Sequence, residues 1–174
     1  KVTDGMSCSD FSLNEPMPLI HDPILGYQWN ELTILQSGKL PTMFIDVKSG
    51  NMDYIHKEKG NKESGTMRLY SADGKLETMA VVDSLKGRGN STWQWNEKKP
   101  YSLRLNEEKD LLGMGAASKW VLLAEAFDRS LMKNKLAYDL ARNAGMPYAP
   151  DCQWVELYLN GEYAGLYLLS ERNE

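Results

Sequence analysis

The stretch VELYLNGEYAGLYLLSE at residues 155–171 decides the last part of the fold. Two runs of β-forming residues, 153–159 and 162–169, flank the dipeptide Asn160-Gly161. A type I′ turn needs positive φ at both central positions, and Asn-Gly is the pair that adopts them most readily. The stretch therefore predicts an antiparallel β-hairpin.

Strand patterns also occur upstream of this hairpin. Residues 42–47 are rich in β-forming side chains, and residues 66–71 alternate apolar and polar before Asp73-Gly74. Three further strands are predicted over residues 76–84, 100–105 and 119–124. The charged stretch 55–64 lies between the first two strands and predicts a solvated loop.

One strong helix is predicted over residues 129–144. Asp128 is a good N-cap, Gly145 suits the position after the helix, and Pro147 blocks its continuation. Apolar residues at helical spacing predict a stripe that packs on the core: Met132, Leu136, Ala137, Leu140, Ala141 and Ala144. The fold class expected from this order is α+β, an antiparallel sheet carrying one main helix.

The N-terminal part of the chain has little periodic pattern. Residues 1–40 are predicted to form an irregular arm with one short element at 29–35, and residues 41–174 to form the folded domain. Cys8 lies in the arm and Cys152 in a predicted strand. Two cysteines leave open one disulfide or a simple buried thiol at Cys152.

Composition excludes several classes of protein. The 174 residues suit one domain, and 42% hydrophobic residues with 25% charged residues are typical of a globular chain. The net charge of −4 disfavours nucleic-acid binding. No apolar run reaches the roughly 20 residues of a membrane helix. The start at Lys1, without a basic and apolar leader, predicts a processed or trimmed product.

The common signatures of hydrolases and metalloenzymes are absent from the sequence. It has no Gly-x-Ser-x-Gly, His-Glu-x-x-His or Gly-Lys-Ser/Thr motif, and its two histidines are His21 and His56. The residues therefore predict neither a Ser/His/Asp hydrolase nor a metal site.

The segment 86–93, KGRGNSTW, is the strongest candidate for ligand binding. Glycines beside a cation, followed by small polar residues, suit a phosphate group, although a simple glycine-bearing turn has the same pattern. The residues concerned are Gly87, Arg88, Gly89, Asn90 and Ser91. Trp93 and Trp95 could share one strand face and form a platform for sugars, or pack as half-buried aromatics.

Seven segments together resemble the spore coat protein H (CotH) kinase-like family over about residues 41–174. They are KGRGNSTW (86–93), KKPYSLRL (98–105), LLGM (111–114), KWVLLA (119–124), DRSLMKNKLAYDLA (128–141), GMPYAP (145–150) and VELYLNGEYAGLYLLSE (155–171). The resemblance implies the small lobe of an atypical protein kinase that uses ATP with Mg²⁺ and phosphorylates serines of secreted or coat proteins. It also implies a protein phosphoacceptor as partner and an extracellular or cell-surface location in a bacterium.

The resemblance assigns binding roles but no catalytic or metal-binding residue. Lys98, Lys99 and Arg104 join the glycine-rich segment as candidates for the phosphates, and Glu171 falls where a hinge would meet adenine. Arg104 stands where a kinase strand has lysine, and the predicted helix has Asp139 as its only internal acid. The catalytic and metal-binding acids of a kinase large lobe are expected beyond residue 174, so these residues alone are expected to be inactive.

Two other interpretations remain open at this stage. One is a non-catalytic surface module that binds carbohydrate or protein through Trp93, Trp95 and Trp154. The other is a purely structural domain.

Overall fold

The computed structural model describes residues 20–21, 28–29 and 39–172. β1 (Ile20–His21) and β2 (Gln28–Trp29) pair antiparallel as a separate two-stranded sheet. The rest of the predicted arm, including Cys8 and most of the expected element at 29–35, lies outside the described residues. Cys152 is buried and its thiol is free.

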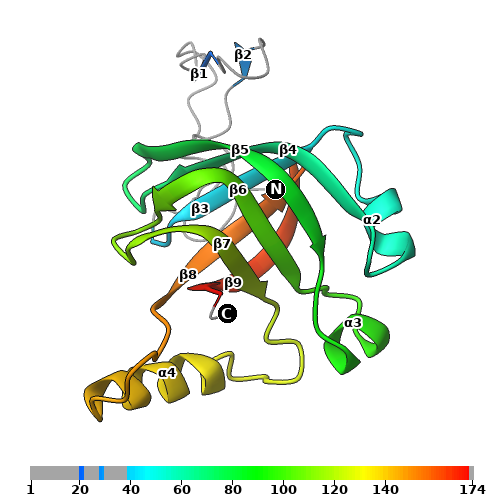
Figure 1. Ribbon diagram of the computed structural model, residues 1–174. Helices are drawn as coiled ribbons and strands as arrows, with labels where there is room; N and C mark the ends of the chain where they lie inside the picture. Colours follow the sequence, from blue (N-terminus) through cyan, green and yellow to red (C-terminus); the bar gives the residue numbers. More distant parts are fainter. Residues whose placement is uncertain (1–19, 22–27, 30–38, 173–174) are drawn as a thin grey trace, which may run out of the picture.

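Seven strands form a closed barrel in the order β3-β4-β5-β6-β7-β9-β8 (Figure 1). Their bounds are β3 Thr42–Val47, β4 Lys62–Tyr70, β5 Leu76–Gly87, β6 Tyr101–Asp110, β7 Ala116–Leu123, β8 Cys152–Leu159 and β9 Glu162–Glu171. All neighbours pair antiparallel except β3 and β8, which pair parallel and close the barrel. Every strand predicted after residue 41 is confirmed, with bounds that shift by a few residues.

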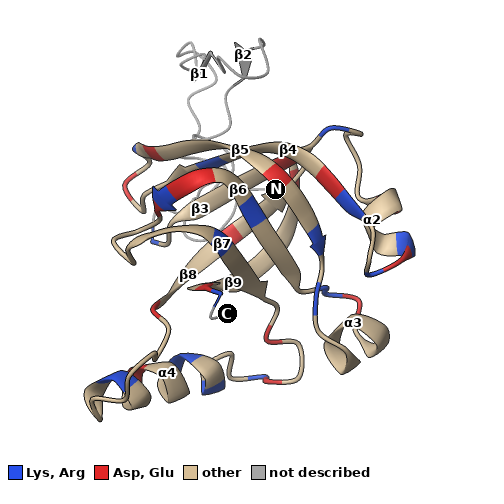
Figure 2. Ribbon diagram, viewed as in Figure 1, with Lys and Arg blue, Asp and Glu red and all other residues tan. Residues whose placement is uncertain are grey.

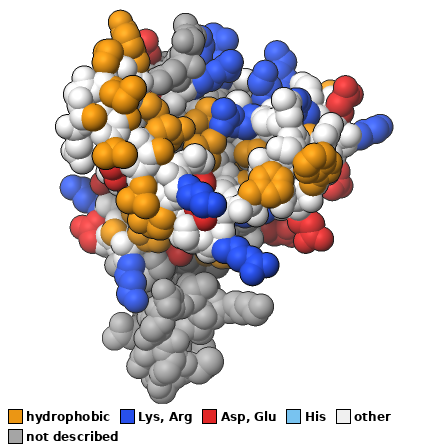
Figure 3. All heavy atoms as spheres, turned by 90° about the horizontal axis from the view of Figure 1, so that it is seen from below, with side chains coloured by type: hydrophobic (Ala, Val, Ile, Leu, Met, Phe, Trp, Pro, Cys, Tyr) orange, Lys and Arg blue, Asp and Glu red, His pale blue; other side chains and the backbone are white. Residues whose placement is uncertain are grey.

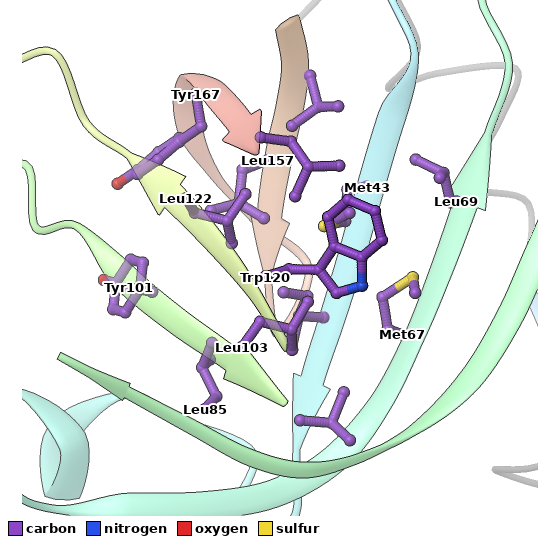
Figure 4. Packing of buried hydrophobic residues seen from close by; sticks show 14 of the residues in the cluster. Met43, Met67, Leu69, Leu85, Tyr101, Leu103, Trp120, Leu122, Leu157 and Tyr167 are labelled. Carbon is purple, nitrogen blue, oxygen red and sulfur yellow. The ribbon is translucent and has the colours of Figure 1, made fainter. Parts of the chain in front are cut away.

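Alternating side chains of these strands fill the barrel. Trp120 is fully buried near the centre, with Met43, Met67 and Leu103 around it (Figure 4). Its indole Nε1 donates to Ala117 O at 2.9 Å, so the one polar atom of the ring is satisfied. A closed barrel of this size leaves an interior that side chains can fill.

The predicted hairpin is confirmed at Asn160-Gly161. The two residues have φ of +50° and +80° between β8 and β9, as the turn requires. The Asn160 side chain also accepts a hydrogen bond from Val47 N at 2.9 Å. This contact ties the hairpin turn to the end of β3.

The predicted fold class is wrong. Within the described residues 39–172, 47% of residues are in strands and 16% in helices, and the seven longer strands close into a barrel. Neither an α+β sheet with one main helix nor the small lobe of a kinase describes this architecture. The physical reason is the parallel pairing of β3 with β8, which joins residues more than 100 positions apart and has no local sequence signal.

The main helix, α4 (Lys133–Asn143), begins later than predicted and does not pack on the core. Leu131 has φ of +60°, which interrupts helical geometry after Asp128. None of the residues in α4 is buried, and Leu136 and Leu140 are 58% and 70% exposed. Figure 3, which looks from below onto the side where α4 lies in Figure 1, shows hydrophobic side chains at this surface.

The charged stretch 55–64 is more ordered than the predicted loop. α2 (Asp53–Lys57) buries Ile55 against the barrel, and β4 already begins at Lys62. Another short helix, α3 (Ser91–Trp95), lies between β5 and β6. No helix among the described residues is long and apolar enough to span a bilayer.

Candidate functional site

The connection between β5 and β6 carries the glycine-rich segment. It leaves β5 at Gly87, turns at Gly89, where φ is +75°, and passes through α3 before Pro100. Arg88 N donates to Pro100 O at 3.1 Å, which holds the two ends together. A Cβ at Gly87 would overlap the ring of Trp93, so glycine is what lets the indole pack on the end of β5.

Lys59 fastens this connection to the loop between α2 and β4. Its ammonium group donates to Gly89 O and to Asn90 Oδ1, both at 2.9 Å. The stretch 55–64 thus lies directly beside the glycine-rich segment.

A pocket of about 320 Å³ lies over the ends of β5 and β6. We call it the basic pocket; its polar side chains are Lys59, Lys86, Arg88, Asn90, Ser102 and Arg172. Lys86 and Ser102 are register partners across the two strands. Figure 2 shows basic residues at the end of β5 and in the connection that follows it. No acidic residue of the described chain lines this pocket, so it suits a phosphate group.

Arg88 lies between the basic pocket and a second pocket of about 280 Å³. Burial lowers the pKa of its guanidinium group, Tyr138 raises it, and Arg172 lowers it further. The group nevertheless stays charged, because arginine is not deprotonated in proteins. Arg88 forms no ion pair with the carboxylates of residues 39–172. Its half-buried positive charge is therefore available to a ligand.

Two carboxyl groups line the second pocket together with Arg88. Glu125 is buried at φ of +50° and accepts a hydrogen bond from Asn134 Nδ2 at 2.8 Å. Burial raises the pKa of Glu125, and the Asn134 bond opposes that shift. The backbone hydrogen bond from Lys133 N, at 2.8 Å, is the main cause that lowers the pKa of Asp128. The described residues contain no group of three metal-ligating side chains.

A sequence profile of the CotH kinase protein family matches residues 85–174, just over half of the chain. The chain belongs to this family. No curated protein matches it. The CotH match begins near the end of β5, so it includes the glycine-rich segment, α4 and strands β6 to β9.

Only some of the residues predicted to bind ATP in this CotH chain lie together in the structure. Four of them meet in the basic pocket: Gly87, Arg88, Gly89 and Asn90. Ser91 is the first residue of α3, directly after them. Arg104 is exposed on β6, with its Nε 3.9 Å from Asp83 Oδ2. Glu171 ends β9 opposite Trp120 and does not line either pocket beside Arg88.

Lys98 and Lys99, from the CotH segment KKPYSLRL, lie in a different pocket. Lys98 Nζ donates to Leu166 O at 2.5 Å, and Lys99 Nζ donates to Trp93 O at 2.6 Å. Both line a pocket of about 410 Å³ at one end of the barrel. Neither lysine lines the basic pocket.

Of the two alternatives for Trp93 and Trp95, a shared strand face does not occur. Trp93 and Trp95 lie in α3 rather than on a strand, and helical residues two apart do not share a face. The Trp93 ring covers Gly87, whereas Trp95 is 76% exposed.

Sequence reasoning assigned no phosphate contact to four polar residues of the basic pocket. Lys59 was included in the predicted solvated loop, Lys86 began the candidate segment 86–93 but was given no contact of its own, and Ser102 was not singled out. Arg172 reaches the pocket after β9, and its backbone N donates to Lys119 O at 3.1 Å. The alternation in β5 and β6 could have predicted that Lys86 and Ser102 face outward. It could not have predicted that they are neighbours, because pairing between strands depends on register.

Proposed function

We propose that this chain provides the ATP-binding surface of a CotH-family protein kinase that transfers the γ-phosphate of ATP to serine of a secreted or surface protein. The observation that carries the proposal is the basic pocket, where cations converge beside a glycine-rich turn without an acidic residue. Membership in the CotH kinase family supports a nucleotide as the ligand.

The residues of the basic pocket fit a chain of phosphates. Arg88 presents a planar guanidinium group that can bind two phosphate oxygens, and Lys86 and Arg172 add positive charge to the same pocket. Ser102 offers a hydroxyl donor directly opposite Lys86. Lys59 holds the turn at Gly89 and Asn90 in place. These contacts would orient ATP and offset its negative charge.

Bound ATP would supply the phosphoryl group. The residues of the basic pocket would bind ATP and orient its phosphates. Positioning and charge stabilisation account for most of the catalysis in phosphoryl transfer. Glu125 and Asp128 line the second pocket with Arg88, and backbone and hydroxyl donors favour the charged form of Asp128. We assign neither of them a metal ion, because the described residues offer no third ligand beside them.

The proposal is tested by the affinity of the full chain for ATP, with and without Mg²⁺, measured by isothermal titration calorimetry. Arg88→Gln and Lys86→Gln should each weaken binding by about 10- to 100-fold, since each removes a charge-assisted contact worth about 1.5–3 kcal/mol. Lys75→Gln is the matched control, because Lys75 lies in the turn between β4 and β5 at the opposite end of the barrel. Equal affinity in all four proteins would overturn the proposal.

A further inference from the structure

A pocket of about 410 Å³ opens at the end of the barrel where β6 and β9 begin. We call it the mouth pocket; its wall includes His56, Lys98, Lys99, Tyr101, Tyr163 and Tyr167. α2 and the residues after α3 contribute to its rim. Its volume is within the range of small-molecule sites, which are common at the mouths of barrels.

Hydrogen bonds hold the inner wall of the mouth pocket rigid. Tyr101 Oη and His56 Nε2 share a hydrogen bond of 2.7 Å, which ties α2 to the barrel. Tyr167 Oη donates to Lys99 O at 2.8 Å. The two tyrosine rings lie 6.2 Å apart, on the side of the core cluster away from Met67 and Leu69 (Figure 4).

Two half-buried ammonium groups line this pocket, Lys98 and Lys99. Lys98 Nζ lies 4.6 Å from the centre of the Tyr167 ring, and Lys99 Nζ lies 5.4 Å from the centre of the Trp93 ring. Neither forms an ion pair with any carboxylate of residues 39–172. Each ammonium has three donors, and among the described residues each donates one hydrogen bond, to a backbone carbonyl.

Burial without a partner disfavours the charged form of a lysine. The pKa of Lys98 is lowered mainly by burial, and the charge of Glu125 only partly offsets that effect. Lys135, by contrast, pairs with Asp139 at 2.8 Å. A negatively charged ligand in the mouth pocket would supply the interaction that Lys98 and Lys99 lack.

We propose that the mouth pocket is a second ligand site, separate from the basic pocket, in which Lys98 and Lys99 bind the oxyanion of a small molecule, either a carboxylate or a phosphate group. The exposed carboxylates Asp53, Glu97 and Glu162 line the rim. They repel further negative charge, so the remainder of the ligand is neutral or positive.

The test is an NMR titration of the full chain with sodium acetate and, separately, with inorganic phosphate at constant ionic strength. Saturable shifts are expected at Lys98, Lys99 and Tyr101, and the two titrations distinguish a carboxylate ligand from a phosphate. Lys98→Gln and Lys99→Gln should each lower the affinity for the more tightly bound of the two anions by about tenfold or more. Glu97→Gln should raise that affinity, because the substitution removes a repelling negative charge from the rim.

Two controls separate this site from the proposed ATP site and from a folding defect. Arg88→Gln should leave the shifts at Tyr101 unchanged, and Lys109→Gln should behave as the wild type, because Lys109 pairs with Glu107 on the surface. Lys98→Arg and Lys99→Arg keep the charge and should retain binding. The proposal is overturned if neither anion gives saturable shifts in the wild type, or if binding survives in both glutamine variants.

Discussion

Replacing Gly87 with alanine adds one methyl group where the Trp93 ring already lies. Gly87 is buried at the end of β5, and the rest of the glycine-rich segment 86–93 follows it. The ring must therefore move, or the connection between β5 and β6 must shift. Either change affects both the fold and the wall of the basic pocket.

The size of the effect follows from two contributions. Overpacking of a well-packed site costs about 1–3 kcal/mol. Moving the ring also breaks the contact between Lys99 Nζ and the Trp93 ring, at 5.4 Å, which is worth about 0.5–1 kcal/mol. For a chain of this size each 1 kcal/mol changes the Tm by about 2–4 °C, so Gly87→Ala should lower the Tm by roughly 3–15 °C.

Differential scanning calorimetry measures this effect, with Gly60→Ala as the matched control. No atom lies within 4 Å of the Cβ position at Gly60, so alanine there should leave the Tm unchanged or raise it slightly. Combining Gly87→Ala with Trp93→Ala should destabilise less than the sum of the single changes, because the clash is gone. The reasoning fails if Gly87→Ala and Gly60→Ala melt at the same temperature.

The barrel core, α4 and His56 each give a further prediction. Trp120→Ala should lower the free energy of unfolding by about 3–5 kcal/mol in a urea titration, since Trp120 is fully buried; a loss below 1 kcal/mol would contradict the packing. Leu140→Gln should change it by no more than about 0.5 kcal/mol, because Leu140 is 70% exposed, and a larger loss would mean that α4 packs on the core. The pKa of His56 is lowered from 6.5, mainly by burial and then by Lys99. The unfolded chain therefore binds more protons just below pH 6.5, and the stability contributed by His56 is lost as the pH falls through that window. The Tm difference between pH 7.5 and 5.5 should accordingly be smaller in His56→Gln than in the wild type, and equal differences would argue against this role.

Local signals predicted the strands well and their arrangement poorly. The Asn160-Gly161 turn and the alternation of β6 depend on neighbours in sequence, so both could be predicted. The parallel pairing of β3 with β8 closes the barrel through contacts between distant residues. No local pattern encodes such a contact, so the sequence predicted an antiparallel sheet with one main helix and not a closed barrel.

The helix shows a different limit of sequence reasoning. The apolar spacing of Leu136 and Leu140 correctly indicated a helix, but periodicity does not show which surface the stripe meets. In the structure both side chains are exposed. The expectation that they pack on the core was therefore wrong.

The basic pocket was predictable where it is continuous in sequence. Gly87 to Asn90 are adjacent, so one motif revealed them. Lys86 and Ser102 are brought together by strand register, and Arg172 by the end of β9. Lys98 and Lys99 lie close to the motif in sequence, yet the turn through α3 carries them to the mouth pocket.

The most direct test of the central claim is a map of backbone amide shifts in the full chain on addition of ATP. The account predicts the largest changes at Lys86, Arg88, Gly89, Ser102 and Arg172, which line the basic pocket. The same changes should be absent in Arg88→Gln at equal ATP concentration. A map with no changes at these five residues, or with changes confined to the mouth pocket, would contradict the account.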